Sequence, residues 1–112
     1  MQIRTSELDG ETIVFEIEEG DDNEFSALLD GPRPNGFALF GPGIPIPVAV
    51  VDGRILAEGL TRDHLLAIEA HEVGHIREQS VEEPVAERAA CELLLNAGEL
   101  DARQILLDRG II

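Results

Sequence analysis

Basic residues are scarce in this chain, and their scarcity restricts the partners that it can have. Lysine and arginine together number 8, against 23 aspartate and glutamate residues, which gives a formal net charge of -15. A surface of this charge repels the phosphates of nucleic acids and the headgroups of anionic membranes. We therefore expect neither nucleic acid nor a membrane as a partner. The excess acidity is typical of a solvated surface, and it would also attract basic peptides.

Cysteine and long apolar runs are nearly absent as well. The one cysteine, Cys91, cannot form a disulfide within the chain, so nothing in the sequence calls for an oxidising compartment. Residues 1–5 lack the apolar run of a signal peptide, and no stretch reaches the length that spans a bilayer. These absences predict a cytoplasmic protein.

The length and the apolar content predict one domain with one core. The 112 residues, 44% of them apolar, suffice for a single compact unit over residues 1–112 and are too few for two. Within it we distinguish an N-terminal part of strands and loops over residues 1–47, a central part over residues 48–97 and a C-terminal helix over residues 98–112. The predicted fold class is α+β.

The N-terminal part shows a strand pattern followed by loops. Apolar and acidic residues alternate from Thr12 to Glu18 after a turn at residues 8–11, which predicts a hairpin from Ile3 to Glu18. Residues 25–29 predict a short helical turn. The three prolines and two glycines of residues 41–47 exclude a central strand, so we expect an extended loop there.

A short apolar run over residues 48–51 predicts a strand beside the functional site. Pro47 at its start is typical of an edge strand, because proline cannot donate a hydrogen bond to a neighbouring strand. An open edge can pair with an extended peptide, whereas an edge that the fold covers cannot, and the sequence leaves both alternatives open. We predict an edge strand.

Five residues, His71-Glu72-Val73-Gly74-His75, carry the clearest chemical signal of the chain. On a helix, positions four apart differ by about 40° around the axis, so His71 and His75 would direct two imidazoles at one metal ion. Glu72 would lie beside the metal, where its carboxylate can take a proton from a metal-bound water. This zincin motif predicts Zn²⁺ as the cofactor and hydrolysis as the reaction.

The motif requires a helix, and the surrounding sequence predicts one. Apolar residues recur at helical spacing from Leu65 to Ile76, and no proline interrupts the stretch from Thr61 onward. Thr61 can cap the start of the helix. His64 would lie on the metal-facing side but about 10 Å from His71 along the axis. We expect a structural role for His64, in which it caps the helix or lines the cleft.

Glu83 is the predicted third ligand. The first helix should end near residues 77 and 78, and residues 80–83 form a capping-box pattern that opens the next helix. A connection this short makes the two helices antiparallel neighbours and brings Glu83 to His75. Two alternatives stay open. Glu83 could instead cap its own helix, or Glu87, one turn further on, could ligate the metal directly.

The stretch over residues 48–95 resembles the gluzincin metallopeptidases, and at this length the chain is most similar to the minigluzincins. Residues 59–63 are similar to the start of their active-site helix, residues 67–75 to its core and residues 83–94 to their glutamate helix. The resemblance implies a small zincin-like fold with an N-terminal sheet, an active-site helix, a glutamate helix and a C-terminal helix. It also implies that Glu87 hydrogen-bonds a ligand histidine, at a position where the family more often has aspartate.

The C-terminal part predicts a last helix. Residues 96–98 end the preceding helix with a glycine, and the next one opens at Leu100 or Asp101. We expect this helix to complete the core. The resemblance implies an alternative, in which residues 98–112 form a latency segment that lies over the cleft, as in the pro-forms of minigluzincins.

Together these features predict a zinc-dependent metallopeptidase that hydrolyses a peptide or protein substrate. His71, His75 and Glu83 would bind Zn²⁺ and leave one position open for a water molecule, and Glu72 would act as the general base. The rival hypothesis is a non-catalytic module that zinc stabilises and that docks a peptide on its edge strand in a binding or regulatory role.

The sequence offers no obvious group to stabilise the oxyanion of peptide hydrolysis. The chain has no tyrosine, and no histidine follows His75. Arg77, Arg88 or Arg103 would have to serve, or the metal would act alone. Because one such donor commonly contributes about 10² to 10³ in rate, we expect weak, latent or highly selective activity.

Overall fold

The structure is a computed structural model, and it describes residues 1–109. Over these residues the chain forms a four-stranded sheet with helices on both of its faces, which confirms the predicted α+β class. In chain order the elements are β1 (Gln2–Thr5), β2 (Ile13–Ile17), α1 (Glu24–Asp30), β3 (Gly36–Leu39), β4 (Val48–Asp52), the 3-10 helix η1 (Gly53–Glu58), α2 (Arg62–Glu78), α3 (Glu83–Asn96) and α4 (Leu100–Arg109). None of the described helices has the length and apolar content needed to cross a membrane.

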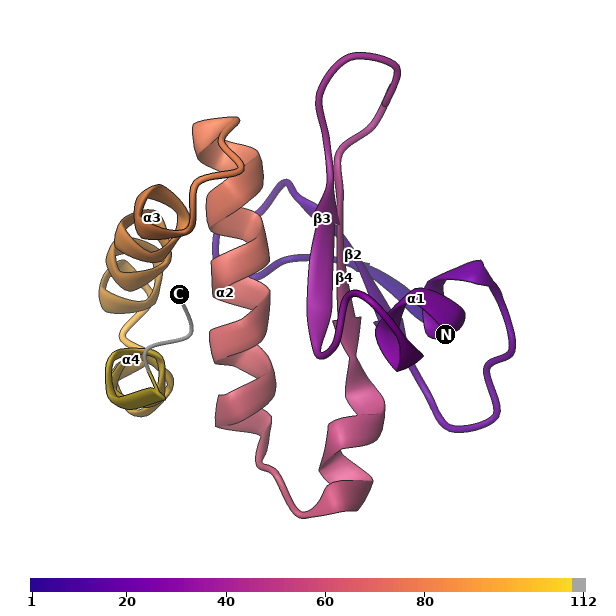
Figure 1. The fold of residues 1–112 in the computed structure, drawn as a ribbon. Coiled ribbons are helices and arrows are strands. Elements are labelled where there is room, and N and C mark those ends of the chain that lie inside the picture. Colours follow the sequence, from indigo (N-terminus) through magenta and orange to yellow (C-terminus); the bar gives the residue numbers. More distant parts are fainter. Residues whose placement is uncertain (110–112) are drawn as a thin grey trace.

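The sheet has the strand order β1-β2-β4-β3. β1 and β2 form the predicted N-terminal hairpin, with Ile3 opposite Phe15. β2 and β4 are parallel, and β3 pairs antiparallel with β4 at the far edge. The predicted loop over residues 41–47 joins β3 to β4 and extends beyond the rest of the molecule (Figure 1).

The prediction of an edge strand at residues 48–51 is wrong. β4 lies between β2 and β3, and all five of its residues are buried. Pro47 precedes the first residue of the strand, where the missing N–H removes no hydrogen bond from the sheet. The uninterrupted apolar run is typical of a strand that is covered on both faces. The edge on this side of the sheet is therefore β3.

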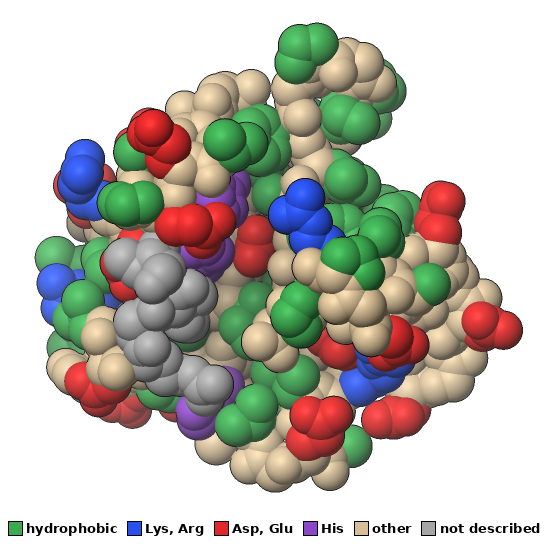
Figure 2. Space-filling model, viewed as in Figure 1, with side chains coloured by type: hydrophobic (Ala, Val, Ile, Leu, Met, Phe, Trp, Pro, Cys, Tyr) green, Lys and Arg blue, Asp and Glu red, His purple; other side chains and the backbone are tan. Residues whose placement is uncertain are grey.

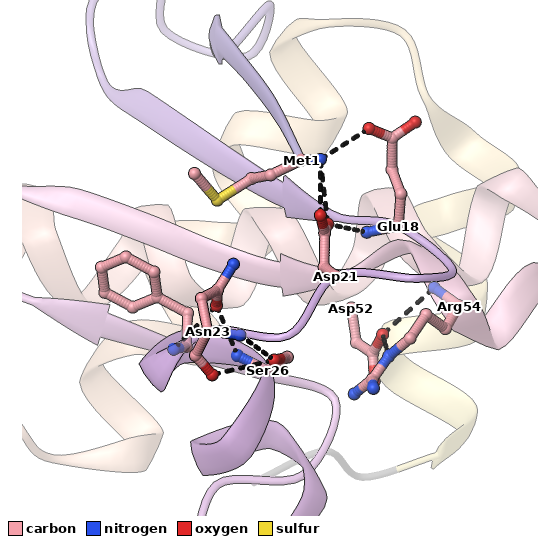
Figure 3. Close-up of polar contacts among 8 residues, drawn as sticks. Met1, Glu18, Asp21, Asn23, Ser26, Asp52 and Arg54 are labelled. Atoms are coloured by element: carbon pink, nitrogen blue, oxygen red, sulfur yellow. Dashed lines mark hydrogen bonds and ion pairs between the residues drawn. The ribbon is translucent and has the colours of Figure 1, made fainter.

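Side chains alternate between two cores on the two faces of the sheet. Ala49 and Val51 of β4 pack with α2, whereas Val50 packs toward α1, on the opposite face. α2 therefore lies directly against the sheet, with α1 on the other side (Figure 1). Asn23 caps α1 by accepting hydrogen bonds from the backbone N–H groups of Phe25 and Ser26 (Figure 3).

α3 and α4 pack against α2 on the side away from the sheet (Figure 1). Ala102 and Leu106 of α4 are fully buried in a cluster with α2 and α3, so the expectation that the last helix completes the core is confirmed. The final residues, 110–112, lie outside the described part of the chain, and the latency alternative, which includes them, stays a prediction.

Candidate metal centre

α2 carries the HExxH motif, and its start is fixed by a reciprocal cap. The Thr61 side chain accepts a hydrogen bond from the backbone N–H of His64, and the His64 ring accepts one from the backbone N–H of Thr61. The predicted structural role of His64 is thereby confirmed, and His64 also lines the cleft described below. α2 ends at Glu78, as expected, and Gln79 turns the chain with a φ of 49°.

Gly74 allows α3 to approach α2 closely. A Cβ atom at this position would lie 2.4 Å from the backbone oxygen of Ala86, which is well inside van der Waals contact. Only glycine therefore permits the observed separation of the two helices. Because Glu83 begins α3, the same close packing carries its carboxylate toward the two histidines.

The predicted capping box at residues 80–83 does not form. Ser80 accepts a hydrogen bond from the backbone N–H of Glu82, but Glu82 itself is the N-cap, and its side chain makes no cap hydrogen bond. The helix begins later than the pattern suggested, since Pro84 occupies its first turn, where a missing N–H is tolerated. The alternative in which Glu83 caps its own helix is wrong, because its carboxylate is directed at the histidines.

The structure brings together the three predicted ligands. The Nε2 atom of His71 lies 2.7 Å from one carboxylate oxygen of Glu83, and the Nε2 atom of His75 lies 3.3 Å from the other. One candidate ligand atom from each residue lies within 4.8 Å of the other two. Donor atoms of a tetrahedral zinc site lie about 3.3 Å apart, so the cluster needs only small side-chain shifts to hold the ion.

The two imidazole rings are held differently. The Nδ1 atom of His75 lies 2.7 Å from the backbone oxygen of Ser80, to which it can donate a hydrogen bond, leaving Nε2 free to face Glu83. Such a contact orients a metal-binding histidine and selects its tautomer. The Nδ1 atom of His71 is buried and has no hydrogen-bond partner among the described residues. Glu87 acts on His71 through its charge, and no hydrogen bond joins the two in the described chain.

The electrostatic surroundings favour a neutral His71. Burial lowers the pKa of His71, the Glu83 carboxylate raises it in opposition, and the neighbouring His75 lowers it further, for a net downward shift. The neutral imidazole is the form that binds a metal. The donor set of two neutral imidazoles and one carboxylate therefore fits Zn²⁺, and it is the ligand count of catalytic sites.

Glu72 lies next to this cluster in a different environment. It is 8% exposed, and no hydrogen bond from a described residue reaches its carboxylate. Burial, together with the negative charge of Glu83, raises the pKa of Glu72 to about 8, and Arg33 opposes the shift. A divalent cation bound by the neighbouring ligands would favour the ionised form and so lower this pKa. A carboxylate whose pKa lies near neutrality suits a general base.

The cluster opens into a cleft of about 480 Å³ between the helices and the edge strand β3. Figure 2 shows histidine side chains in a hollow between the helical part and the sheet part of the molecule, beside acidic side chains. The lining comes from β3 and residues 32–35 on one side, from α2 and Glu83 on the other, and from Ile105 of α4. Phe40 lies beside His75, with ring centroids 6.5 Å apart.

The arginine that faces the cleft is one that the sequence analysis missed. Arg33 lines the cleft, and its positive charge acts on Glu72. The three arginines proposed as oxyanion donors do not line it, and Arg77 instead pairs with Glu11 at 3.1 Å. The sequence held one signal, since two prolines flank Arg33 and restrict its backbone, but a loop residue cannot be placed across a cleft without the topology.

No family model matches the chain, and no curated protein and no solved structure matches it. The resemblance to the minigluzincins therefore depends on the sequence motifs alone, and it stays a prediction.

Proposed function

We propose that this protein is a zinc-dependent metallopeptidase. The observation that carries the proposal is the convergence of His71, His75 and Glu83 beside a buried, unpaired Glu72 at the base of a cleft. A largely buried carboxylate that no described side chain pairs with is costly to ionise, and this cost supports a chemical role for Glu72. With one cysteine and no demand for an oxidising compartment, the cytoplasm is the proposed location.

Each residue of the site would have its own part in peptide hydrolysis. When bound, Zn²⁺ would polarise the scissile carbonyl and acidify the attacking water. Glu72 would accept the proton of that water and deliver it to the leaving amine. The contact with the Ser80 backbone keeps the His75 ring in its ligating orientation. Within residues 1–109, β3 has a partner strand on one side only, so its other edge can pair with an extended peptide across the site.

A non-catalytic role is the second candidate, and one observation favours it. Glu83 opens α3 while both histidines lie on α2, so a metal at this centre would join the two helices and stabilise a small core. The edge of β3 could then dock a peptide without cleaving it. This candidate predicts zinc binding and peptide binding, but no hydrolysis.

Metal content and peptide digestion test the proposal together. We expect one zinc ion per purified chain, and cleavage of a mixed peptide library by the zinc-loaded protein. Glu72→Gln should retain zinc and fold but abolish cleavage, whereas His71→Ala should lose zinc. Zinc binding without cleavage in the unmodified protein would instead support the binding module. A protein with no affinity for zinc would contradict both candidates.

Acid provides an independent check of the ligands. Protonated imidazoles cannot bind a metal, so zinc affinity should fall below about pH 6. Because burial lowers the pKa of His71, the fall extends into more acidic solution, and zinc affinity that stays constant throughout the acid range would contradict ligation by His71 and His75.

A further inference from the structure

Arg33 is an exposed cation in a cleft of a strongly acidic protein. Among the described residues it is the one arginine that lines the cleft, and no ion pair within that part of the chain engages it. Four other arginines each pair with at least one carboxylate, at 2.6 to 3.5 Å, and these are Arg4, Arg54, Arg62 and Arg77. The charge of Arg33 acts on Glu72 across the cleft, but no carboxylate of the described residues lies within ion-pair distance of Arg33.

Residues 32–35, the segment that carries Arg33, are fixed by two prolines and by backbone hydrogen bonds. Pro32 and Pro34 flank the residue and restrict its chain conformation. The backbone N–H of Arg33 donates to the oxygen of Leu28 at 2.9 Å, and the oxygen of Asn35 accepts from Asp52 at 2.9 Å. The guanidinium therefore projects from a fixed point of the fold.

Arg54 joins the end of α1, which precedes this segment, to the end of β4, which Asn35 of the segment contacts. Its guanidinium contacts Asp52, at the end of β4, at 2.8 Å (Figure 3). It also contacts Asp30, at the end of α1, at 2.8 Å. The ends of α1 and β4 are thus joined on either side of the segment, which limits how far Arg33 can move relative to the sheet.

The two ends of β3 present different chemistry to the cleft. At its start, the backbone of Gly36 packs so closely on α2 that an added Cβ would lie 3.4 Å from Cγ of Glu72. Arg33 stands three residues before this point. At the other end Phe40 stacks beside His75, and Val81, which is 79% exposed, also lines the cleft. One end of the cleft is therefore cationic and the other apolar.

We propose that Arg33 binds a carboxylate of the substrate and so selects peptides that place an acidic side chain or a free C-terminus at the Gly36 end of the cleft. The inference rests on the proposed function, since it names the substrate class of the same site. Guanidinium and carboxylate match in geometry and form charge-assisted hydrogen bonds. The net charge of -15 slows the approach of an anionic peptide, but at physiological salt it is screened beyond about 8 Å, so the local pair decides selectivity.

The exposure of Arg33 favours recognition over a direct part in the chemistry. A donor that stabilises an oxyanion must be fixed in advance in a site without water. The Arg33 side chain is exposed, and no polar group of the described chain holds its guanidinium. Such a group can close on a charged partner that the substrate brings with it.

Binding to an inactive variant tests the proposal without hydrolysis. Fluorescence anisotropy would measure the affinity of zinc-loaded Glu72→Gln protein for labelled alanine-rich peptides. In each set of peptides, one position carries Glu, Gln or Lys, and the position is varied from set to set. A parallel pair would carry a free or an amidated C-terminus. We expect one acidic peptide to bind about tenfold more tightly than its neutral counterpart, the value of one charge-assisted hydrogen bond. The position of that acid, internal or terminal, identifies the source of the carboxylate.

Charge reversal at Arg33 supplies the decisive comparison. Arg33→Glu should abolish the preference for the acidic peptide and favour the lysine peptide, and Arg33→Lys should keep part of the acid preference. Arg88→Glu makes the same change in net charge on an exposed part of α3 outside the cleft, and it should leave the preference intact. Equal losses in Arg33→Glu and Arg88→Glu, or equal binding of all peptides, would overturn the proposal.

The test separates this proposal from the proposed function. Acid-selective binding that depends on Arg33, in a protein that cleaves nothing, would support the carboxylate site and contradict the peptidase. In the active protein, a fall in kcat of the same size for acidic, neutral and basic peptides in Arg33→Lys, with unchanged binding, would show an oxyanion donor and overturn the recognition role.

Discussion

Glu69 and Glu72 are two buried glutamates on the same helix, and they meet opposite edges of the sheet. Glu69, which is 3% exposed, accepts hydrogen bonds from Arg4 at 2.6 Å and from Ser6 at 2.7 Å. Glu72, which is 8% exposed, lies beside Gly36 at the β3 edge, where no described residue donates a hydrogen bond to it. The same side chain, at nearly the same depth, is thus fully paired at one edge and unpaired at the other.

We interpret the difference as that between a structural carboxylate and one that serves the proposed chemistry. At the β1 edge Arg4 also binds Glu16 at 3.0 Å, so one guanidinium compensates two buried charges and ties the hairpin to α2. At the β3 edge, the charge of Glu83 adds to the cost of ionising Glu72. A fold gains nothing from such a group, and catalytic sites are where it is retained.

Removing the charge of Glu72 should give the largest effect on activity and almost none on the fold. We expect Glu72→Gln to lower kcat by about 10² to 10⁴, the usual contribution of a general base. The free energy of unfolding should stay the same or rise, because burying Glu72 costs either the desolvation of its carboxylate or its protonation above the ordinary pKa, and a neutral amide incurs neither cost. Peptide hydrolysis and urea denaturation of the same samples would measure the two quantities.

Glu69→Gln is the matched control for that experiment. It should destabilise the protein, because the amide cannot replace the ion pair with Arg4, yet leave kcat per folded molecule unchanged. If Glu72→Gln destabilised the fold as much as Glu69→Gln does, the contrast between the two glutamates would be lost.

Removing the cation at the β1 edge should give the largest loss of stability. Arg4→Ala leaves Glu16 and Glu69 buried without their partner, and breaking a buried pair in this way costs about 3 kcal/mol or more. Zinc affinity, measured on the folded protein, should not change. Arg62→Ala removes a guanidinium that is 68% exposed and 3.5 Å from Glu16, and we expect a change of less than about 1 kcal/mol. Equal effects of the two substitutions would contradict the role assigned to Arg4.

The separation of α2 and α3 determines whether Glu83 reaches His71 and His75 at the metal centre. In Gly74→Ala the new methyl group would meet the backbone of Ala86, so α3 must move outward and take Glu83 with it. We expect a destabilisation of about 2 kcal/mol from overpacking, although the same change in an exposed helix would stabilise by about 1 kcal/mol.

Zinc affinity should fall together with stability in Gly74→Ala, because Glu83 no longer reaches the histidines. Gly10→Ala is the control: it places a side chain at a φ of 70° in a loop with open space around it, and it should leave zinc affinity unchanged. Isothermal titration with zinc would compare the two variants. Unaltered affinity in Gly74→Ala would show that the close packing is not needed for the metal centre.

The two edges also differ in how far the sequence could predict them. The helix of His71 and His75 follows from local periodicity and a cap at Thr61, and the position of Glu83 follows from a short connection. The pairing of Glu69 depends on residues 63 to 65 positions away in the chain. The place of Arg33 in the cleft depends on the order of the strands. Local sequence patterns contain neither kind of information. For the same reason the prediction of an edge strand after Pro47 is wrong, since a proline before a strand does not determine which strands lie beside it.

Asp9 is another carboxylate whose pKa differs from its ordinary value, and it makes the stability of the fold depend on pH. Burial acts to raise the pKa of Asp9, but hydrogen bonds from Thr12 and Glu11 and the contact with Arg77 outweigh it, so the pKa is lowered. The folded state therefore binds the proton less readily than the unfolded state, whose pKa is about 3.9. Asp9 contributes stability above that pH, and the contribution is lost as the pH falls through the folded pKa.

Replacing Asp9 should consequently flatten the acid limb of the stability curve. We expect Asp9→Asn to cost about 1 kcal/mol at pH 7 and progressively less below about pH 4, where the Asp9 carboxylate of the unmodified protein becomes protonated. Urea midpoints measured from neutral pH into the acid range would give both curves. A constant difference at every pH would mean that Asp9 titrates alike in both states. Convergence in acid would show that the fold stabilises Asp9 as an anion, in contrast to Glu72, whose pKa is raised to about 8 by burial and by the charge of Glu83.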